Sequence, residues 1–429
     1  MLHRISAGVV GLAALTWLAV TGARAGALRA DDPAALARTH SLGDVIDQTR
    51  DRPVHILFVH GMRADRAGLA GPFMEGLCRY GPVCCPPGAA APGAAARHFI
   101  DLKPWPRRAE VMGRAVWPDE KQWMASMPFV DRYRFERPGE PPVIVDEVNW
   151  WPLLMAFRCR ILVAPESRLS GVDKAHLDLC RRWLTSAEYD DALKGPGALG
   201  GGAWANAALK RELVNWGLAD AVIALGPMRT LIRRTIDLAF AYAAAFDERG
   251  VGGQEFVVVC ESLGSFVVLD AAGDLFADAP KAREVVAATS DLYFFANQFA
   301  LLELGRVRGL DDHAKPDLAA PAAATPPSEV SHFAVLSRWA LGPTLPRDLA
   351  ASPRPRQVIA FSDPSDALTY DVPPLPGAIV VNIHDRNEFD WFGLIADPTK
   401  AHSGHSRNPA VLKRMFERSP PVPGAAAPS

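Results

Sequence analysis

The stretch that decides the fold is Phe256-Val-Val-Val-Cys-Glu-Ser262-Leu-Gly-Ser-Phe-Val-Val-Leu-Asp270. Its first four residues are aromatic or β-branched without a polar interruption, which is typical of a strand buried on both faces. The apolar residues from Gly264 onward indicate a buried helix. The segment therefore predicts a strand that turns sharply into a helix, with Ser262 at the turn.

A serine at such a turn has two interpretations. As a helix cap, its hydroxyl accepts a hydrogen bond from one of the first helical amides. As a nucleophile elbow, the turn lifts Oγ clear of the sheet, and the first helical N–H groups point at a developing oxyanion. Small residues two positions before and after the serine let the strand and helix pass closely, and here they are Cys260 and Gly264. The segment alone leaves both interpretations open.

The composition is that of a globular protein with a large core. Of the 429 residues, 49% are hydrophobic and 22% are charged, and the formal net charge is −2. These values are ordinary for a soluble domain. The charges form no basic stripe, so the sequence predicts no nucleic-acid partner.

Residues 1–25 have the pattern of a secretory signal peptide. A charged start is followed by an apolar run over residues 5–20 and by an Ala-x-Ala ending at Ala25. This run is shorter than the roughly 20 residues that a membrane-spanning helix needs, so an uncleaved membrane anchor is the less favoured alternative. We expect cleavage near Ala25 and export to the periplasm or the medium.

Six cysteines are present, namely Cys78, Cys84, Cys85, Cys159, Cys180 and Cys260. In an oxidising compartment some of them can pair, and Cys78 with Cys84 or Cys85 would close a short loop. Their connectivity stays open at this point. Cys260, inside the strand, is expected to be a free core thiol. No cysteine pair has a second pair at zinc spacing, so no metal site is predicted.

Strands and helices alternate along the chain. The expected strands are 55–59, 132–136, 143–149, 256–260, 291–296, 357–361 and 378–383. The expected helices are 32–50, 71–80, 175–184, 204–246 with a break at Gly226-Pro227, and 409–417 behind an Asn408 cap. This alternation predicts an α/β fold in which helices flank a mostly parallel central sheet and ligands bind at the carboxyl ends of the strands.

We expect one domain over residues 40–418, with helical and loop insertions at about 150–203 and 305–356. The second insertion contains the low-complexity segment 314–328, which is expected to be loop or disordered. The Pro/Ala-rich residues 419–429 are expected to form a disordered tail.

Two apolar features each have a structural and a functional interpretation. Trp150 and Trp151 follow a strand and either pack in the core or wall an apolar substrate cleft. The segment 228–236 places arginines against an apolar helix face, which suits packing on the sheet, a lid, or contact with a membrane surface. We favour packing for both features.

Polar residues with complementary chemistry follow the other strands, namely His60-Gly61-Met62, Asp363, Asp366, His402 and His405. A serine hydroxyl is a poor nucleophile at neutral pH, so it needs a neutral imidazole to take its proton. The imidazole in turn needs a carboxylate that holds its tautomer and stabilises its charged form. The chain therefore offers a candidate serine, acid and base, in that order.

This order of parts resembles the α/β-hydrolases, in which Ser, Asp and His follow one another along the chain. The resemblance runs from about Val54 to Glu417, and the His-Ser-Gly segment before the last helix resembles lipase-like members. It implies the α/β-hydrolase fold and a serine hydrolase, of the esterase or lipase kind, that forms an acyl-serine intermediate. No cofactor is implied.

The resemblance favours Asp366 over Asp363 as the acid. In the superfamily the acid is commonly followed two residues later by an aliphatic residue that packs under the turn. Leu368 stands in that position relative to Asp366, whereas Ser365 stands there relative to Asp363. Asp363 stays the alternative.

The same resemblance favours His402 over His405 as the base. The histidine of the superfamily often precedes the proline of the following helix by seven residues, and His402 does so relative to Pro409. Otherwise His405 is interpreted as a solvent-facing residue near the helix start.

For the oxyanion hole, the residue after the nucleophile supplies one amide, which is that of Leu263. The residue after His-Gly resembles the second donor, which is Met62. A glycine-rich loop of the HGGG type is absent, since Arg63 and Ala64 follow Met62.

The expected partner is a small-molecule or lipid ester, with peripheral membrane contact as a further possibility, and the oligomeric state is not indicated. The alternative from another class is a non-catalytic binding or scaffolding protein on the same fold, in which Ser262 only caps a helix. Labelling with a fluorophosphonate probe separates the two.

Overall fold

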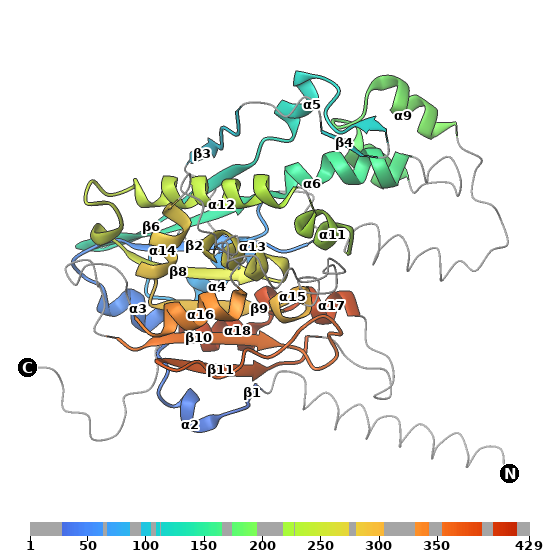
Figure 1. Cartoon of the computed structure of the whole chain (residues 1–429). Coiled ribbons are helices and arrows are strands. Elements are labelled where there is room, and N and C mark those ends of the chain that lie inside the picture. The colour runs from blue at the N-terminus through green and yellow to red at the C-terminus, as the bar shows by residue number, and fades with distance from the viewer. Residues whose placement is uncertain are drawn as a thin grey trace, which may run out of the picture.

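A nine-stranded, mostly parallel sheet with helices on both faces forms the centre of the molecule, which is an α/β architecture (Figure 1). The computed structural model describes residues 28–62, 67–85, 96–103, 109–111, 113–164, 174–194, 218–226, 228–273, 280–303, 331–342, 354–387 and 398–417. The predictions for residues 1–25, 204–217, 314–328 and 419–429 lie outside these ranges. Among the described helices, none is long and apolar enough to cross a membrane.

The strand order across the sheet is β1-β11-β10-β9-β8-β2-β7-β6-β3. The neighbours from β11 to β7 pair in parallel, while the pairs β1–β11, β6–β7 and β3–β6 are antiparallel. The sheet is therefore parallel at its centre and antiparallel towards both edges. The strands are β1 Arg29–Ala30, β2 Val54–Val59, β3 Ala96–Phe99, β6 Phe129–Arg137, β7 Glu140–Asn149, β8 Glu255–Glu261, β9 Asp291–Phe295, β10 Arg356–Ser362 and β11 Ala378–His384.

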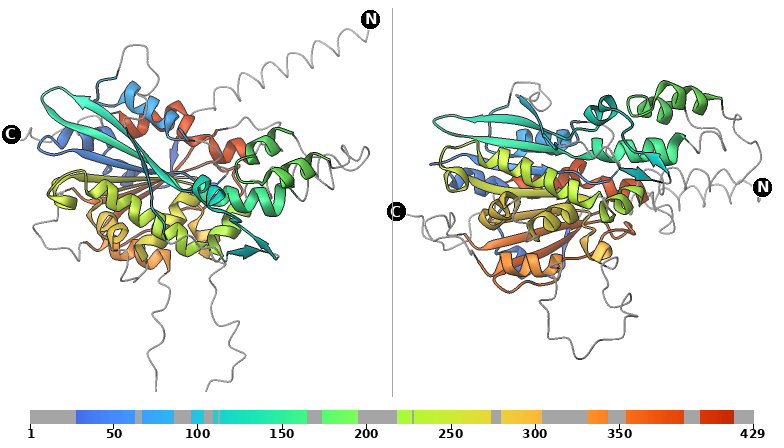
Figure 2. Two further views of the ribbon diagram at one scale, coloured as in Figure 1. Left: turned by 90° about the horizontal axis from the view of Figure 1, so that it is seen from above. Right: turned by 45° about the horizontal axis from the view of Figure 1, so that its top comes forward.

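The helices cover both faces of the sheet and close a separate core on each (Figure 2). Side chains of successive strand residues alternate between these cores, so Leu57 lies in one and Phe58 in the other. One face carries α6 Trp151–Phe157, α11 Ala219–Leu225, α12 Arg229–Ala244, α13 Leu263–Gly273, α14 Lys281–Ala288, α15 Phe299–Glu303 and α16 His332–Ala340. The other carries α2 Pro33–Leu36, α3 Leu42–Gln48, α4 Gly71–Tyr80 and α18 Pro409–Phe416.

Burial on both faces explains why the central strands are continuous apolar runs. Every residue of β2 and β9 is buried, and so is β8 up to Cys260. The helix α13 is buried along its whole length, as the sequence predicts. The register pairs Val59 with Cys260, so β2 and β8 end side by side.

The segment predicted as one helix over 32–50 is two helices, α2 and α3. The second helix begins at Ser41, whose hydroxyl accepts from the amide of Asp44 while the Asp44 carboxylate accepts from the amide of Ser41. This capping box starts a new helix within the predicted one. By contrast, α18 begins as predicted, with the Asn408 side chain accepting from the amide of Ala410.

The first insertion consists of α6, a π-helical segment Arg158–Val163, and two further helices, α8 Lys174–Cys180 and α9 Ser186–Leu193. The predicted helix 175–184 is thus shorter at its end. A disulfide between Cys159 and Cys180, which the sequence does not indicate, joins α8 to the preceding segment. In the second insertion, α16 packs on the face that carries α13 and belongs to the core. Short elements precede these insertions: β4 Glu110–Val111, β5 Arg114–Ala115 and α5 Glu120–Ala125.

The remaining cysteines occupy three different states. Cys78 pairs with Cys85, which decides the choice that the sequence leaves open, and Cys84 is free and exposed. Cys260 is free and buried, as predicted, and burial raises the pKa of its thiol.

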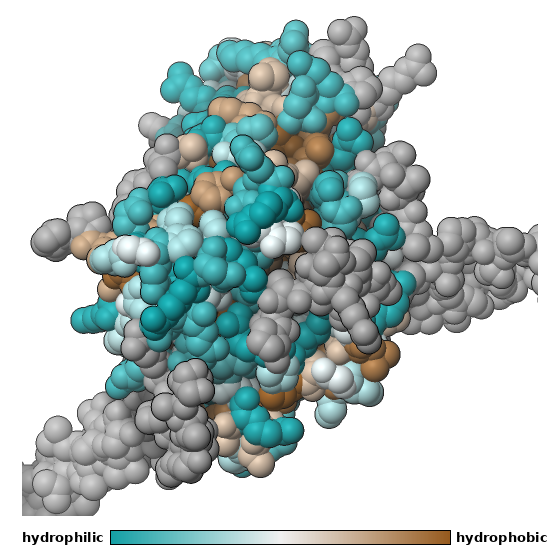
Figure 3. Space-filling view, turned by 90° about the vertical axis from the view of Figure 1, so that its left-hand side faces the viewer, coloured by the Kyte–Doolittle hydropathy of each residue, from teal (hydrophilic) through white to brown (hydrophobic). Residues whose placement is uncertain are grey.

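One face of the molecule shows how polar the surface of the described residues is. On the face in Figure 3, hydrophilic residues predominate and apolar residues gather only in small groups. Two arginines of α12, Arg229 and Arg233, both bind the buried carboxylate of Asp270 on α13. The apolar side of α12 belongs to the core on one face of the sheet, which agrees with the favoured interpretation of packing on the sheet.

Candidate active site

Ser262 occupies the turn between β8 and α13. Its φ of 54° lies in the left-handed region, which non-glycine residues rarely adopt, and its amide donates to the carbonyl of Phe295 over 2.7 Å. Strained backbone of this kind clusters at functional sites. The predicted sharp turn is thus present, with Ser262 buried at its apex.

Two glycines allow the chain to pass close to this turn. A Cβ on Gly61 would lie 2.4 Å from the Cβ of Ser262, and a Cβ on Gly264 would lie 2.2 Å from the carbonyl oxygen of Val59. No side chain fits at either distance. The His-Gly ending of β2 is therefore required by contact with the serine turn.

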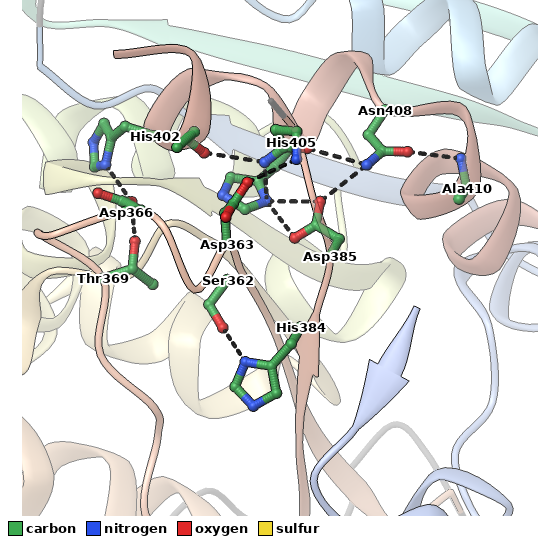
Figure 4. Close-up of polar contacts among 12 residues, drawn as sticks. Ser362, Asp363, Asp366, Thr369, His384, Asp385, His402, His405, Asn408 and Ala410 are labelled. Carbon is green, nitrogen blue, oxygen red and sulfur yellow. Dashed lines mark hydrogen bonds and ion pairs between the residues drawn. The ribbon is translucent and has the colours of Figure 1, made fainter. Parts of the chain in front are cut away.

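His402 reaches Ser262 from α17 Pro398–Ser403, a helix distant in sequence. Its Nε2 lies 2.6 Å from Oγ of Ser262. Its Nδ1 lies 2.7 Å from Oδ2 of Asp366 (Figure 4). Asp366 follows β10, and its side chain is 1% exposed. Serine, histidine and aspartate thus form one continuous hydrogen-bonded chain.

The environment of Asp366 keeps it ionised. Burial would raise the pKa of this carboxyl, but hydrogen bonds from His402, from the Thr369 hydroxyl and from the Leu368 amide outweigh burial and lower the pKa. An ionised carboxylate accepts from Nδ1–H, so Nε2 is the nitrogen that accepts from Ser262. Leu368 also contributes through its amide, beyond the aliphatic packing for which the sequence singles it out.

The two alternative residues, Asp363 and His405, make other contacts. Asp363 accepts from the amides of Ser365 and Asn387 over 2.8 and 2.7 Å, which ties the turn after β10 to the segment after β11. His405 is fully buried, and its Nδ1 lies 2.9 Å from the carboxylate of Asp385. The solvent-facing interpretation of His405 is therefore wrong, because the Asp385 carboxylate draws the ring into the interior.

The residues predicted to supply the oxyanion amides both flank Ser262. Leu263 is the first residue of α13, and Met62 follows Gly61, which packs against Ser262. The preceding residue, His60, is buried and stacks on Trp150 with ring centroids 5.4 Å apart, while the Trp150 indole donates to the His60 carbonyl over 3.0 Å. This contact anchors the segment that carries Met62.

His60 itself is neutral. Burial lowers its pKa to about 4, with the nearby Arg158 charge acting in the same direction and the hydrogen bond to the Gly61 carbonyl opposing both. The charge on His60 therefore does not vary around neutral pH.

Trp150, on which His60 stacks, is fully buried, so it packs in the core as the sequence favours.

A buried glutamate, which the sequence does not single out, holds the far end of the same loop. The Glu147 carboxylate on β7 accepts from the amides of Gly68 and Leu69 over 3.2 and 2.6 Å and from the Tyr133 hydroxyl over 3.0 Å. The loop between β2 and α4 is thus fixed to β7 by Trp150 at its start and by Glu147 at its end.

Gln298 is a further polar residue beside His402 that sequence reasoning missed. Its side-chain nitrogen lies 3.3 Å from Nε2 of His402, and the residue is buried. The sequence does carry a signal, because Asn297 and Gln298 are uncharged polar residues placed directly after an apolar strand. Their position at the carboxyl end of β9 is where a parallel sheet binds ligands.

A cleft of about 1180 Å³ lies at the first insertion, apart from Ser262 and His402, which do not line it. Trp151 lines this cleft at the end of β7, and the exposed apolar side chains of Phe99, Met124 and Leu179 also line it. Trp151 therefore fits the cleft-wall interpretation in part, although it is itself buried.

The described residues contain no group of three or more His, Cys, Asp or Glu side chains that could hold a metal ion. The contacts of Ser262, His402 and Asp366 offer the chemistry of an activated serine, with a buried carboxylate behind the imidazole. Comparison of the chain with protein-family models, with curated proteins and with solved structures found no match.

Proposed function

We propose that the protein is a serine hydrolase of the α/β-hydrolase fold that cleaves carboxylic esters through an acyl-serine intermediate. The observation that carries the proposal is the chain from Ser262 Oγ through His402 to Asp366, with distances of 2.6 and 2.7 Å. Nucleophile, base and orienting acid within hydrogen-bond reach of one another are the signature of nucleophilic catalysis by a hydroxyl.

The position of the three residues in the fold supports the same class. Ser262, Asp366 and His402 follow β8, β10 and β11, whose carboxyl ends meet at one edge of the sheet. The order along the chain is that of the α/β-hydrolases. Because one fold hosts many functions, the proposal depends on the site more than on this likeness.

In the first half of the proposed reaction, Ser262 Oγ attacks the ester carbonyl carbon while its proton passes to Nε2 of His402. The tetrahedral intermediate collapses as the bond to the alcohol oxygen breaks, and that oxygen takes the proton from Nε2. In the second half, water attacks the acyl-serine and gives a proton to Nε2. The acid then leaves as Oγ regains that proton.

Charge develops on the carbonyl oxygen during both attacks, and the amides of Leu263 and Met62 are the proposed donors to it. Loss of one such donor typically costs about 2.7–4 kcal/mol of transition-state stabilisation. Trp150, whose indole donates to the carbonyl of His60, holds the segment that leads to Met62 and so supports the position of the second amide.

The test is labelling with a fluorophosphonate probe, combined with turnover of p-nitrophenyl esters of increasing acyl length. Wild type is expected to label at Ser262 and to hydrolyse at least one ester, and Ser262→Ala to do neither. Full activity of Ser262→Ala would contradict the mechanism. A wild type that neither labels nor turns over any ester would favour the non-catalytic binding protein.

We also propose that the protein is exported. The signal-like pattern of residues 1–25 supports this, and so do the disulfides Cys78–Cys85 and Cys159–Cys180, since disulfides persist in oxidising compartments.

A further inference from the structure

Gln298 lies on a strained segment next to the serine turn. Among the described residues, Ser262 and Ala296 are the non-glycine residues with positive φ, at 54° and 51°. They follow β8 and β9, which are neighbours, and the Ser262 amide donates to the carbonyl of Phe295, the last residue of β9. Two adjacent strands therefore end in the same unusual conformation, and the second of these ends directs Gln298 towards the site.

The hydrogen bonds around His402 determine which end of the Gln298 amide faces it. Nδ1–H of His402 donates to Asp366, so Nε2 carries a lone pair and accepts. The neighbour of Nε2 at 3.3 Å must therefore be the NH₂ group of Gln298. This group and the Ser262 hydroxyl, at 2.6 Å, share one acceptor.

The sheet order places Gln298 on the side away from the proposed oxyanion hole. Strand β8 lies between β2, which leads to Met62, and β9, which leads to Gln298. When the carbonyl oxygen of the tetrahedral intermediate faces Met62, the departing alcohol oxygen lies on the opposite side of Ser262. That oxygen must approach Nε2 of His402 to be protonated. Gln298 is thus beside the path of the leaving group.

Proton transfer changes what the Gln298 amide can bind. When Nε2 takes the proton of Ser262, it becomes a donor and can no longer accept from Gln298. The freed N–H then needs another acceptor, because the residue is 1% exposed and a buried donor without a partner is costly. As the tetrahedral intermediate then collapses, negative charge develops on the departing alcohol oxygen, which approaches Nε2 to be protonated and is the nearest acceptor for the freed N–H.

We propose that Gln298 is a catalytic residue that donates a hydrogen bond to the leaving-group oxygen as the bond between the acyl carbon and that oxygen breaks. His402 supplies the proton, and Gln298 stabilises the charge before the proton arrives, so no net proton passes through the amide. The inference rests on the proposed function. It adds that the site is built for esters whose alcohol is a poor leaving group, such as alkyl esters.

The segment that holds Gln298 is rigid enough for this role. The Asn297 carboxamide accepts from the Ser265 hydroxyl over 3.0 Å and from the Phe299 amide over 3.1 Å, and it donates to the Tyr370 carbonyl over 3.1 Å. The Ala296 amide donates to the carbonyl of Phe361 on β10. Groups held in this way can act on a transition state without reorganising.

The test compares two esters with the same acyl group, p-nitrophenyl butyrate and ethyl butyrate, in wild type and Gln298→Met. Nitrophenolate leaves with little assistance, whereas ethoxide does not. We expect kcat/KM to fall by about 10- to 100-fold for the ethyl ester and by less than about threefold for the p-nitrophenyl ester. The matched control is Gln48→Met, the same change at an exposed position of α3, which is expected to alter neither value.

Equal losses on both esters, or no loss on either, would overturn the inference. Inactivity of wild type on p-nitrophenyl butyrate together with no fluorophosphonate labelling would instead overturn the proposed function, and the inference with it. If Gln298→Met does not fold, Gln298→Glu serves, because a carboxylate beside Nε2 favours the imidazolium. The half-maximal point on the acid side of its pH–rate profile should then move to higher pH, and an unmoved profile would count against the inference.

Discussion

His402 and His405 stand three residues apart and differ in the carboxylate that each meets. His402 is 13% exposed and bridges Asp366 and Ser262, so its ring faces the reacting hydroxyl. His405 is buried against Asp385. Burial lowers the pKa of His405, but the Asp385 carboxylate has the larger, opposite effect, so the pKa is raised overall. The first histidine is placed for proton transfer and the second for structure.

This difference predicts opposite effects for two alanine variants. His402→Ala should lower ester turnover by about 10⁴-fold or more with little change in unfolding free energy. His405→Ala should lower the unfolding free energy by about 3–5 kcal/mol, because it leaves the Asp385 carboxylate buried without its partner. Steady-state kinetics and denaturant titration of the two variants are the measurements. A His405→Ala variant that is inactive but fully stable would reverse the assignment of His402 and His405.

Cys260 provides a second prediction for a single residue. Its thiol is buried two residues before Ser262, and burial raises its pKa, so it should react slowly, whereas the exposed Cys84 should react readily. A maleimide reagent followed by peptide mass spectrometry is expected to label Cys84 in the native protein and Cys260 only after unfolding. Rapid native labelling of Cys260, with loss of activity in Cys260→Ser, would instead indicate a chemical role for the thiol.

At the scale of elements, the site depends on how closely β2 approaches the turn after β8. The two strands run in parallel register up to Val59 and Cys260, and Gly61 then passes over Ser262 with no room for a Cβ. The same closeness brings the Met62 segment beside the nucleophile. The packing of β2 against the turn after β8 therefore sets the geometry of the site.

Gly61→Ala is accordingly expected to disrupt the site. Relief of a 2.4 Å contact must displace either the β2 end or the serine turn, so ester turnover should fall by at least about 10²-fold, with a loss of about 1–3 kcal/mol in stability. Gly71→Ala is the matched control, because a Cβ there meets nothing within 4 Å. Kinetics and thermal unfolding of both variants decide the matter, and an active Gly61→Ala would show that the approach is not required.

On the scale of the whole molecule, a buried charge cluster joins α12, α15 and α16 to α13, the helix that follows Ser262. Asp270 of α13 binds Arg229 and Arg233 of α12, and it lies 3.5 Å from His332 of α16. His332 also contacts Glu303 of α15 over 2.7 Å. The second insertion is thereby tied to the helix that begins after Ser262.

The cluster predicts a pH dependence of stability. Burial opposes ionisation of Asp270, but His332, Arg233 and Arg229 outweigh burial and lower the pKa of this carboxyl from its ordinary value of 3.8 to about 2. This contribution, about 2 kcal/mol, is present above pH 4 and is lost as the pH falls towards 2. Burial likewise opposes the charge on His332, yet Asp270 and Glu303 raise its pKa above 6.5, so its contribution is lost as the pH rises through the raised value.

The cluster should therefore stabilise the fold most between about pH 4 and 6.5. Asp270→Asn is expected to lower the unfolding free energy by about 3–5 kcal/mol at pH 5. It should also remove the part of the fall in unfolding free energy below pH 4 that comes from the cluster. Denaturant titrations of wild type and variant from pH 2 to 8 measure both effects. Parallel pH curves for the two proteins would contradict the role of the cluster.

Export is a prediction about the whole chain. Protein purified from its native host should begin near Gly26 and be found outside the cytoplasm, because the Ala-x-Ala pattern ends at Ala25. Amino-terminal sequencing checks this. An intact Met1 terminus would contradict it.

By itself the sequence determined where the buried strands run, since strands covered on both faces carry continuous apolar runs, and residues 56–59, 256–260 and 292–295 are such runs. It also determined that a mostly parallel sheet forms and that a serine, aspartates and histidines follow strand ends. These are local properties of the chain. The edge strands β1 and β3 and the core position of α16 depend on contacts with residues distant in sequence and were not predicted.

Only the tertiary structure decided which of the candidates meet. Asp363 and Asp366 lie on the same turn, and His402 and His405 lie on adjacent turns, so sequence spacing could favour one of each without showing their partners. The pairing of Cys78 with Cys85 and the approach of Gln298 to His402 were likewise decided in space. The physical reason is that a contact depends on the positions of two groups, and for groups that lie on different elements only the packing of the sheet and helices sets those positions.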